Sequence, residues 1–172
     1  MSAIRVRGLD HVVLRVRDLA RSLRFYGEVL GCREERRIEA LGLVQLRAGA
    51  SLVDLVDVVG PLGRIGGDPA GESGRNVDHF ALQIEEFDES ALRAHLAAHG
   101  VEPGDVGERY GAEGTGPSMY IRDPDGNVVA LKGPATKRER SRTLRPLSGP
   151  GLVRSVIEKN ALVVVGLRAH SL

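Results

Sequence analysis

The sequence predicts an α+β fold built from two copies of a β-α-β-β-β module. Residues 9–16, LDHVVLRV, and residues 77–84, VDHFALQI, lie 68 positions apart (77 against 9), and both begin with an aliphatic residue, Asp and His. In each case an alternating apolar pattern, typical of a half-buried strand, precedes a helical pattern and three further strand patterns. Because one such module leaves a face of its sheet uncovered, we expect the two modules to pair.

A helix is expected after each repeated strand. The first, DLARSLRFYGEVLG, begins at Asp18 and ends at Gly31, and the second, DESALRAHLAAHG, begins at Asp88 and ends at Gly100. An Asp side chain accepts hydrogen bonds from the first free amides of a helix, and Gly adopts the left-handed conformation that ends one. Both segments carry leucines at helical spacing, so each is predicted to pack one face on its sheet.

Residues 1–134 are predicted to form a single domain. It comprises module 1 at about 5–59, a Gly/Pro-rich linker at 60–76 that is either a connection or a mobile loop beside a site, and module 2 at about 77–134. The glycine-rich segment 107–118 is expected to be a loop, either around a ligand or on the surface. The remaining strands are expected at 33–39, 42–48 and 51–58, and at 102–109, 117–122 and 126–132.

Composition limits the classes of protein to consider. The chain has 172 residues, 42% of them hydrophobic, which is enough for a buried core. There is no apolar run long enough for a membrane span, and the N-terminal sequence enters a strand pattern without a signal peptide, so we expect a cytoplasmic protein. The only cysteine, Cys32, has no partner for a disulfide and is expected to be a packing residue.

The C-terminal segment differs from the rest in charge. Residues 1–134 carry 16 basic and 21 acidic side chains, a net charge of −5, whereas residues 135–172 carry 8 and 2, a net charge of +6. The basic run 137–145 lacks interleaved aromatic residues and is interpreted as a solvated linker, with no nucleic-acid or membrane partner. The apolar stretch 151–167 is expected to dock on the core or on a partner subunit.

Strand alternation places four corresponding positions on the sheet faces opposite the helices. These positions are His11 and Asp54 in module 1, and His79 and Ala130 in module 2. Two neutral imidazoles and one carboxylate can hold a divalent ion and leave coordination positions open for a chelating substrate. A metal-free polar network, in which Asp54 pairs with Arg15 or a histidine, is the alternative from spacing alone.

These residues resemble a known family. LDHVVLRVRDLARSLRFYGEVLG, SLVDL, VDHFAL and YIRDPDGNVVAL are together similar to the vicinal oxygen chelate superfamily, which includes glyoxalase I, extradiol dioxygenases and bleomycin-binding proteins, over about residues 5–133. The resemblance implies paired modules and a divalent metal held at positions that correspond here to His11, Asp54, His79 and Ala130. Ala130 departs from the family pattern, which has Glu there, so neither the glyoxalase nor the dioxygenase mechanism transfers intact.

The resemblance implies a metal-dependent enzyme for a small substrate with vicinal oxygens, acting by dioxygenase or by lyase or isomerase chemistry. The expected metal is iron, manganese, nickel or zinc, held by His11, Asp54 and His79, and a homodimer is expected by analogy. No catalytic residue is assigned. The alternative is a metal-free protein that binds a small ligand, as bleomycin-resistance proteins do, and Ala130 favours it.

Further polar residues are candidates for substrate contacts. His95 and His99 lie four residues apart on the second helix, a spacing that can bind zinc, but with no third ligand nearby they are interpreted as ordinary helix residues. No nucleotide-binding loop is predicted, because the glycine-rich segment lacks the required strand-to-helix context. The expected substrate-binding residues are Arg15, Gln83, Arg109, Tyr120 and Arg122.

Overall fold

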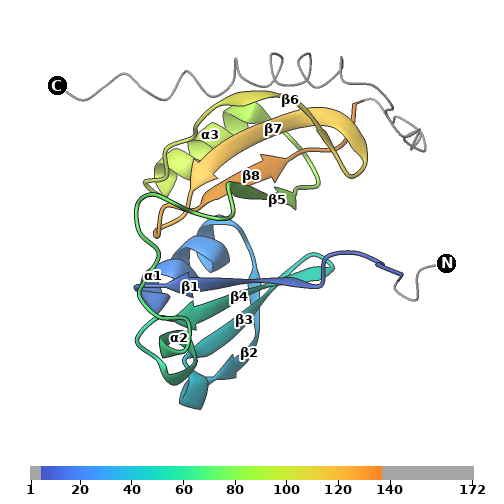
Figure 1. The fold of residues 1–172 in the computed structure, drawn as a ribbon. Helices are drawn as coiled ribbons and strands as arrows, with labels where there is room; N and C mark the ends of the chain where they lie inside the picture. The colour runs from blue at the N-terminus through green and yellow to red at the C-terminus, as the bar shows by residue number, and fades with distance from the viewer. Residues whose placement is uncertain (1–4, 137–172) are drawn as a thin grey trace. The chain divides into compact units, whose positions relative to one another are not determined.

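The computed structural model describes residues 5–136, which form two similar four-stranded sheets (Figure 1). In each sheet the first strand runs parallel to the fourth, and the other neighbours are antiparallel. The predicted pair of β-α-β-β-β modules is therefore confirmed. Sheet 1 has the order β1 (His11–Val16), β4 (Ser51–Asp57), β3 (Leu43–Ala48), β2 (Arg33–Ile38), and sheet 2 has the order β5 (His79–Gln83), β8 (Val128–Lys132), β7 (Gly114–Arg122), β6 (Val106–Gly111).

The helices begin at the predicted caps. The Asp18 carboxylate accepts a hydrogen bond of 2.9 Å from the Arg21 amide at the start of α1 (Leu19–Arg24). The Asp88 carboxylate accepts one of 3.0 Å from the Ala91 amide at the start of α3 (Glu89–Ala98). Gly31 and Gly100, with φ values of 70° and 67°, follow the two helices as expected. The remaining short helices are η2 (Glu39–Leu41) and α2 (Pro61–Arg64).

A π-helical turn, η1 (Phe25–Val29), continues α1 and was not predicted. It is closed by a hydrogen bond of 3.1 Å from the Leu30 amide to the Phe25 carbonyl. The turn brings two consecutive aromatic side chains, Phe25 and Tyr26, into the core, where they are 5% and 0% exposed. A regular 3.6-residue period places successive residues about 100° apart, so the sequence pattern gave no sign that both would be buried.

Each first strand divides its side chains between two faces as predicted. The hydrophobic core includes Val12, Leu14 and Val16 of β1, Phe80 and Leu82 of β5, and Ile84 directly after β5. The opposite face of each sheet is called its open face here. The open face of sheet 1 carries His11, Val13, Arg15 and Asp54, and that of sheet 2 carries His79, Ala81, Gln83 and Ala130.

The glycine-rich segment 107–118 is not a loop. Strands β6 and β7 pair without interruption from Val106 and Met119 to Gly111 and Gly114, so only two residues form the turn of a hairpin. Gly114 has a φ of 125°, a conformation that side chains disfavour. The prediction of a ligand-binding or surface loop was wrong, because glycines that looked like loop residues lie within a regular strand ladder.

The DPDGN turn between β7 and β8 is organised by a buried carboxylate. Oδ1 of Asp123 accepts hydrogen bonds from the amides of Asp125 (3.0 Å) and Asn127 (2.7 Å). Oδ2 accepts from the Asn127 side chain (2.8 Å) and from the hydroxyl of Tyr26 (2.8 Å). Because Tyr26 belongs to module 1, this carboxylate ties the turn of module 2 to the helix of module 1.

The C-terminal segment 135–172 lies almost entirely outside the described residues. The solvated basic linker at 137–145 and the docking of the apolar stretch 151–167 therefore remain predictions. Within residues 5–136, no helix is long and apolar enough to cross a membrane.

We predict that Tyr26→Phe lowers the free energy of unfolding by about 1.5–3 kcal/mol, because a buried carboxylate loses one of its donors. Burial and the charge of Asp123 raise the pKa of Tyr26 above its ordinary value. The folded state therefore holds the phenol proton where the unfolded state releases it, so this stability is complete below about pH 10 and declines as the pH rises further.

Urea unfolding at pH 7 and at pH 10.5 checks both statements. The matched control is Tyr110→Phe, since the Tyr110 side chain is 66% exposed, and it should behave as wild type at both pH values. Equal stability of the Tyr26→Phe variant and wild type at pH 7 would show that the bond to Asp123 is not a stabilising link.

Candidate functional site

Asp54 is a buried carboxylate at the centre of the open face of sheet 1. It pairs in register with Val13 on β1 and Gln45 on β3, and it is only 5% exposed. Its Oδ2 accepts a hydrogen bond of 2.9 Å from Nε2 of Gln45, whereas its Oδ1 is buried without a hydrogen-bond partner. A buried carboxylate oxygen without a partner is costly in free energy, and a bound cation is one way to remove that cost.

His11 lies on the same face with its ring oriented by the preceding residue. Nδ1 of His11 donates to Oδ1 of Asp10 at 2.7 Å, and this fixes Nε2 as the nitrogen with a free lone pair. The hydrogen bond to Asp10 raises the pKa of His11, and the charge of Asp54 adds to the effect. His11 pairs in register with Leu52, two residues before Asp54 on the adjacent strand, so the two side chains are near neighbours on the open face of sheet 1.

His79 repeats this arrangement on sheet 2. Its Nδ1 donates to Oδ2 of Asp78 at 2.7 Å, which again leaves Nε2 free. Its ring meets the ring of Tyr120 edge to face, with centroids 5.3 Å apart. Sequence reasoning missed the roles of Asp10 and Asp78, although the repeated Asp-His pair was the available signal: in each module the Asp holds the ring of the His that follows it.

The strand registers confirm the internal alignment of Asp54 with Ala130. The rows that cross the two open faces are Val13, Asp54 and Gln45 in sheet 1, and Ala81, Ala130 and Tyr120 in sheet 2. Ala130 is 3% exposed. Sheet 2 therefore has no carboxylate where sheet 1 has one, and its side chains in that row present a phenol and two methyl groups.

The three predicted metal ligands are distributed over two sheets. His11 and Asp54 share sheet 1, and His79 stands on sheet 2. Among residues 5–136, no three His, Cys, Asp or Glu side chains are grouped so that they could hold a metal ion. The donor types fit a divalent ion, and the buried Oδ1 of Asp54 supports one, but within the described part of one chain only two of the three donors come together.

Arg15, predicted to contact substrate, is bonded to the linker. Its guanidinium donates to the carbonyls of Gly66 (2.8 Å), Asp68 (3.1 Å) and Gly67. A side chain at position 66 would approach this guanidinium to 2.7 Å, so the Arg15 side chain would have to move to accommodate one. Arg15 thus fixes the linker to the open face of sheet 1, and the alternative pairing of Arg15 with Asp54 is not observed.

Some of the predicted substrate-binding side chains on sheet 2 are bonded within the protein, and others are exposed. Arg109 pairs with Asp105, donates to the carbonyls of Gly107 (3.1 Å) and Ser118 (3.3 Å), and lies 4.6 Å from the ring centroid of Tyr120. Arg109 therefore supports Tyr120. Gln83 and Arg122 are exposed, and both belong to the open-face rows of sheet 2.

Lys132 is a buried polar residue on the open face of sheet 2 that sequence reasoning missed. It is 8% exposed, and its Nζ donates to the carbonyls of Arg109 (2.8 Å) and Gly116 (2.6 Å). The internal alignment pairs it with Val56, so the charged residue at an apolar position was the available signal. Its ammonium group ties β8 to the β6–β7 hairpin.

The histidines of α3 and the cysteine have ordinary roles. His95 Nε2 bonds the Val29 carbonyl at 2.8 Å, and His99 Nδ1 bonds the His95 carbonyl at 2.9 Å, which supports their interpretation as helix residues. Cys32 is 7% exposed, and burial raises the pKa of its thiol, as expected for a packing residue.

Comparison with known proteins identifies relatives of this fold. The model of the Glyoxalase/Bleomycin resistance protein/Dioxygenase superfamily matches residues 8–131. The virulence protein STM3117 of Salmonella typhimurium is 32% identical over 127 residues, which cover 72% of this chain and 81% of that protein.

Among solved structures, the integron cassette protein VCH_CASS1 from the mobile metagenome of V. cholerae is 27% identical with a TM-score of 0.58, covering 77% of this chain and 98% of that one. The fosfomycin resistance protein FosX of Listeria monocytogenes is 24% identical with a TM-score of 0.56, covering 74% and 91%, and shows the fold alone.

We predict that Asp54→Asn, studied with a chelator present, is more stable than wild type at pH 7, by on the order of 1 kcal/mol. The amide still accepts the hydrogen bond from Gln45, and the buried negative charge is removed. Urea unfolding of the two metal-free proteins measures the difference. A loss of stability would mean that the buried carboxylate is already compensated within the chain.

Proposed function

The chain belongs to the Glyoxalase/Bleomycin resistance protein/Dioxygenase superfamily, and we propose that it is a metal-dependent enzyme acting on a small substrate with vicinal oxygens. The observation that carries the proposal is the buried Oδ1 of Asp54, which lacks a partner and lies on the strand adjacent to that of His11, on the same open face. A divalent cation would satisfy this oxygen, and a neighbouring imidazole nitrogen is free to bind the same ion.

The third donor is proposed to be His79 of a second copy of the chain. Strands β1 and β5 are edge strands of their sheets, so each has an unpaired side. Exposed apolar side chains lie on or just before these strands: Leu9 is 73% exposed, Val13 is 51% and Val77 is 58%. Open edges with apolar side chains favour association, and pairing of two chains would bring the open face of one sheet 1 to the other chain's sheet 2.

The chain's own residues orient the donors and the substrate. Asp10 and Asp78 hold the two imidazole rings so that each Nε2 stays free, and Gln45 holds the second oxygen of Asp54. Iron, manganese, nickel or zinc would act as a Lewis acid that stabilises negative charge on the chelated substrate oxygens. Tyr120 and Gln83 offer polar groups to the substrate from sheet 2.

Ala130 limits the reaction mechanisms that this site could use. In the row of sheet 2 that corresponds to Asp54, no carboxylate is present to take up a proton from substrate. A lyase or isomerase reaction would then need a base supplied elsewhere, and a dioxygenase reaction would use His11, Asp54 and His79 alone as metal ligands.

We propose the cytoplasm as the location of the protein, because the only cysteine has no partner for a disulfide.

A metal-free ligand-binding protein is the second candidate. Ala130 favours it, because the position is occupied by a small buried side chain that offers no donor atom. In this case Asp54 would be satisfied by a donor group of the ligand, and the histidines would serve as hydrogen-bonding groups.

Elemental analysis of the full-length protein purified without chelator distinguishes these functions. We expect about one equivalent of iron, manganese, nickel or zinc per chain in wild type. The metal should be lost in the variants His11→Ala, Asp54→Asn and His79→Ala, and kept in the control His99→Ala, whose ring bonds only a helix carbonyl. A metal content below a few hundredths of an equivalent, even after loading, would favour the binding protein.

Mixing two variants that are each expected to lack metal tests whether the metal site is shared between two chains. A dimer of one His11→Ala chain and one His79→Ala chain retains a single complete set of donors: His11 and Asp54 of one chain with His79 of the other. We therefore expect the mixed dimer to recover one site in two, measured as metal content after subunit exchange. If mixing restores no metal although each homodimer exchanges subunits, the donors do not come from two chains.

A further inference from the structure

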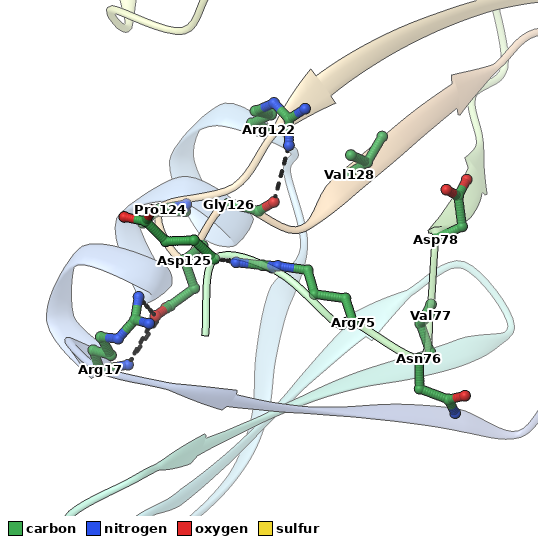
Figure 2. A pocket seen from close by; sticks show the side chains of 11 residues that line it. Arg17, Arg75, Asn76, Val77, Asp78, Arg122, Pro124, Asp125, Gly126 and Val128 are labelled. Carbon is green, nitrogen blue, oxygen red and sulfur yellow. Dashed lines mark hydrogen bonds and ion pairs between the residues drawn. The ribbon is translucent and has the colours of Figure 1, made fainter. Parts of the chain in front are cut away.

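A hollow of about 570 Å³ lies at the end of sheet 2 that carries His79 (Figure 2). Its walls come from the linker, the residues before β5, the end of β7 and the DPDGN turn. This volume is in the range of sites for small molecules. Three linker residues, Glu72, Arg75 and Asn76, are part of the wall.

Some of the charged groups in the wall are already used by the fold. Arg17 forms an ion pair with Asp125 at 3.5 Å, and its backbone amide donates to the same carboxylate at 3.2 Å. Arg75 donates to the Asp125 carbonyl (2.7 Å) and to the Asn127 side chain (2.8 Å), as Figure 2 shows in part. These contacts fix the linker and the turn to each other. The charge of Arg17 is paired with Asp125, whereas Arg75 bonds only neutral oxygens and keeps its positive charge.

Three other charged groups in the wall remain open. Arg122 is exposed, and its guanidinium makes a single hydrogen bond, 3.2 Å long, to the Gly126 carbonyl. The Asp78 side chain is 96% exposed and uses one oxygen to hold the ring of His79. Glu72 is exposed and makes no ion pair with any other residue of the range 5–136. Besides the guanidinium of Arg75, the hollow therefore offers that of Arg122 and two carboxylates.

The strand register sets the spacing of these opposite charges. Arg122 pairs with Val128 across β7 and β8, and Val128 pairs with His79 across β8 and β5. Two steps of about 4.8 Å between strands place the Cα atoms of Arg122 and His79 roughly 10 Å apart. Val128 lies between Arg122 and Asp78 in Figure 2, so an apolar side chain separates these two opposite charges.

We propose that this hollow binds a zwitterionic small molecule of the amino-acid type. Its carboxylate would pair with Arg122, its ammonium group would pair with Asp78, and its carbon skeleton would contact Val128. A simple anion would meet the carboxylates of the wall, and a simple cation would meet its guanidinium groups, so each leaves charges of the hollow uncompensated.

The hollow adjoins the candidate metal site, because Asp78 both lines it and holds the ring of His79. The inference therefore extends the substrate class: the molecule presented to the metal site carries an amino-acid group. That extension rests on the proposed function, whereas binding of the zwitterion to the hollow does not need a metal.

The test is a ligand titration of the full-length protein in the presence of a chelator, followed through the NMR signals of the Val77 and Val128 methyl groups. The probes are L-alanine and L-leucine, with propionate carrying only the carboxylate and ethylamine only the ammonium group. We expect saturable shifts with the amino acids, and affinities at least about tenfold weaker for the two half-molecules. Equal affinity for propionate, or no shift with either amino acid, would overturn the inference.

Variants assign the two ends of the ligand. Arg122→Gln and Asp78→Asn should each weaken amino-acid binding by about tenfold or more, whereas the control Arg93→Gln, which removes a charge paired with Glu89 on α3, should leave it unchanged. Unchanged binding in Arg122→Gln would also overturn the inference. Metal content is measured separately, so the failure of zwitterion binding and the failure of the metal site are distinguishable.

Discussion

The hydrogen bond from Tyr26 to Asp123 is the contact on which the arrangement of this domain depends. Tyr26 is fully buried in the π-helical turn of module 1, and Asp123 holds the DPDGN turn of module 2 through three further hydrogen bonds. The same turn carries Asp125, which pairs with Arg17, and Asn127, which binds Arg75. A substitution of Asp123 is therefore expected to alter the positions of the turn, the linker and the end of β1.

The two modules share the same backbone arrangement but carry different side chains at the centre of their open faces. Both modules hold a histidine at the start of the first strand with an aspartate fixing its ring, and both place a fourth-strand residue beside it. In sheet 1 that residue is a buried carboxylate, and in sheet 2 it is an alanine next to a tyrosine. Sheet 1 therefore combines an imidazole with a buried carboxylate, whereas sheet 2 combines an imidazole with a phenol.

Much of the fold followed from local patterns in the sequence. Asp18 and Asp88 predicted the helix starts, and the alternation of Val12, Leu14 and Val16 predicted the buried face of β1, because capping and alternation depend on neighbouring residues alone. The β6–β7 hairpin was mistaken for a loop because glycine is common in loops, although here the glycines lie in two strands that pair with each other across a turn of two residues. The roles of Arg15 and Lys132 were also missed, because both bind backbone carbonyls far along the chain.

The sequence by itself determined the two modules, the family and the positions of His11, Asp54, His79 and Ala130 on the open faces, because the repeat and the period of a strand fix which side chains share a face. Tertiary structure decided which atoms are left without partners. In the folded chain Arg15 bonds the linker, Oδ1 of Asp54 is buried and unpaired, and Val128 lies between Arg122 and Asp78 in Figure 2. Burial and hydrogen bonding depend on contacts between distant segments, and these contacts are what turn a set of candidate residues into a site.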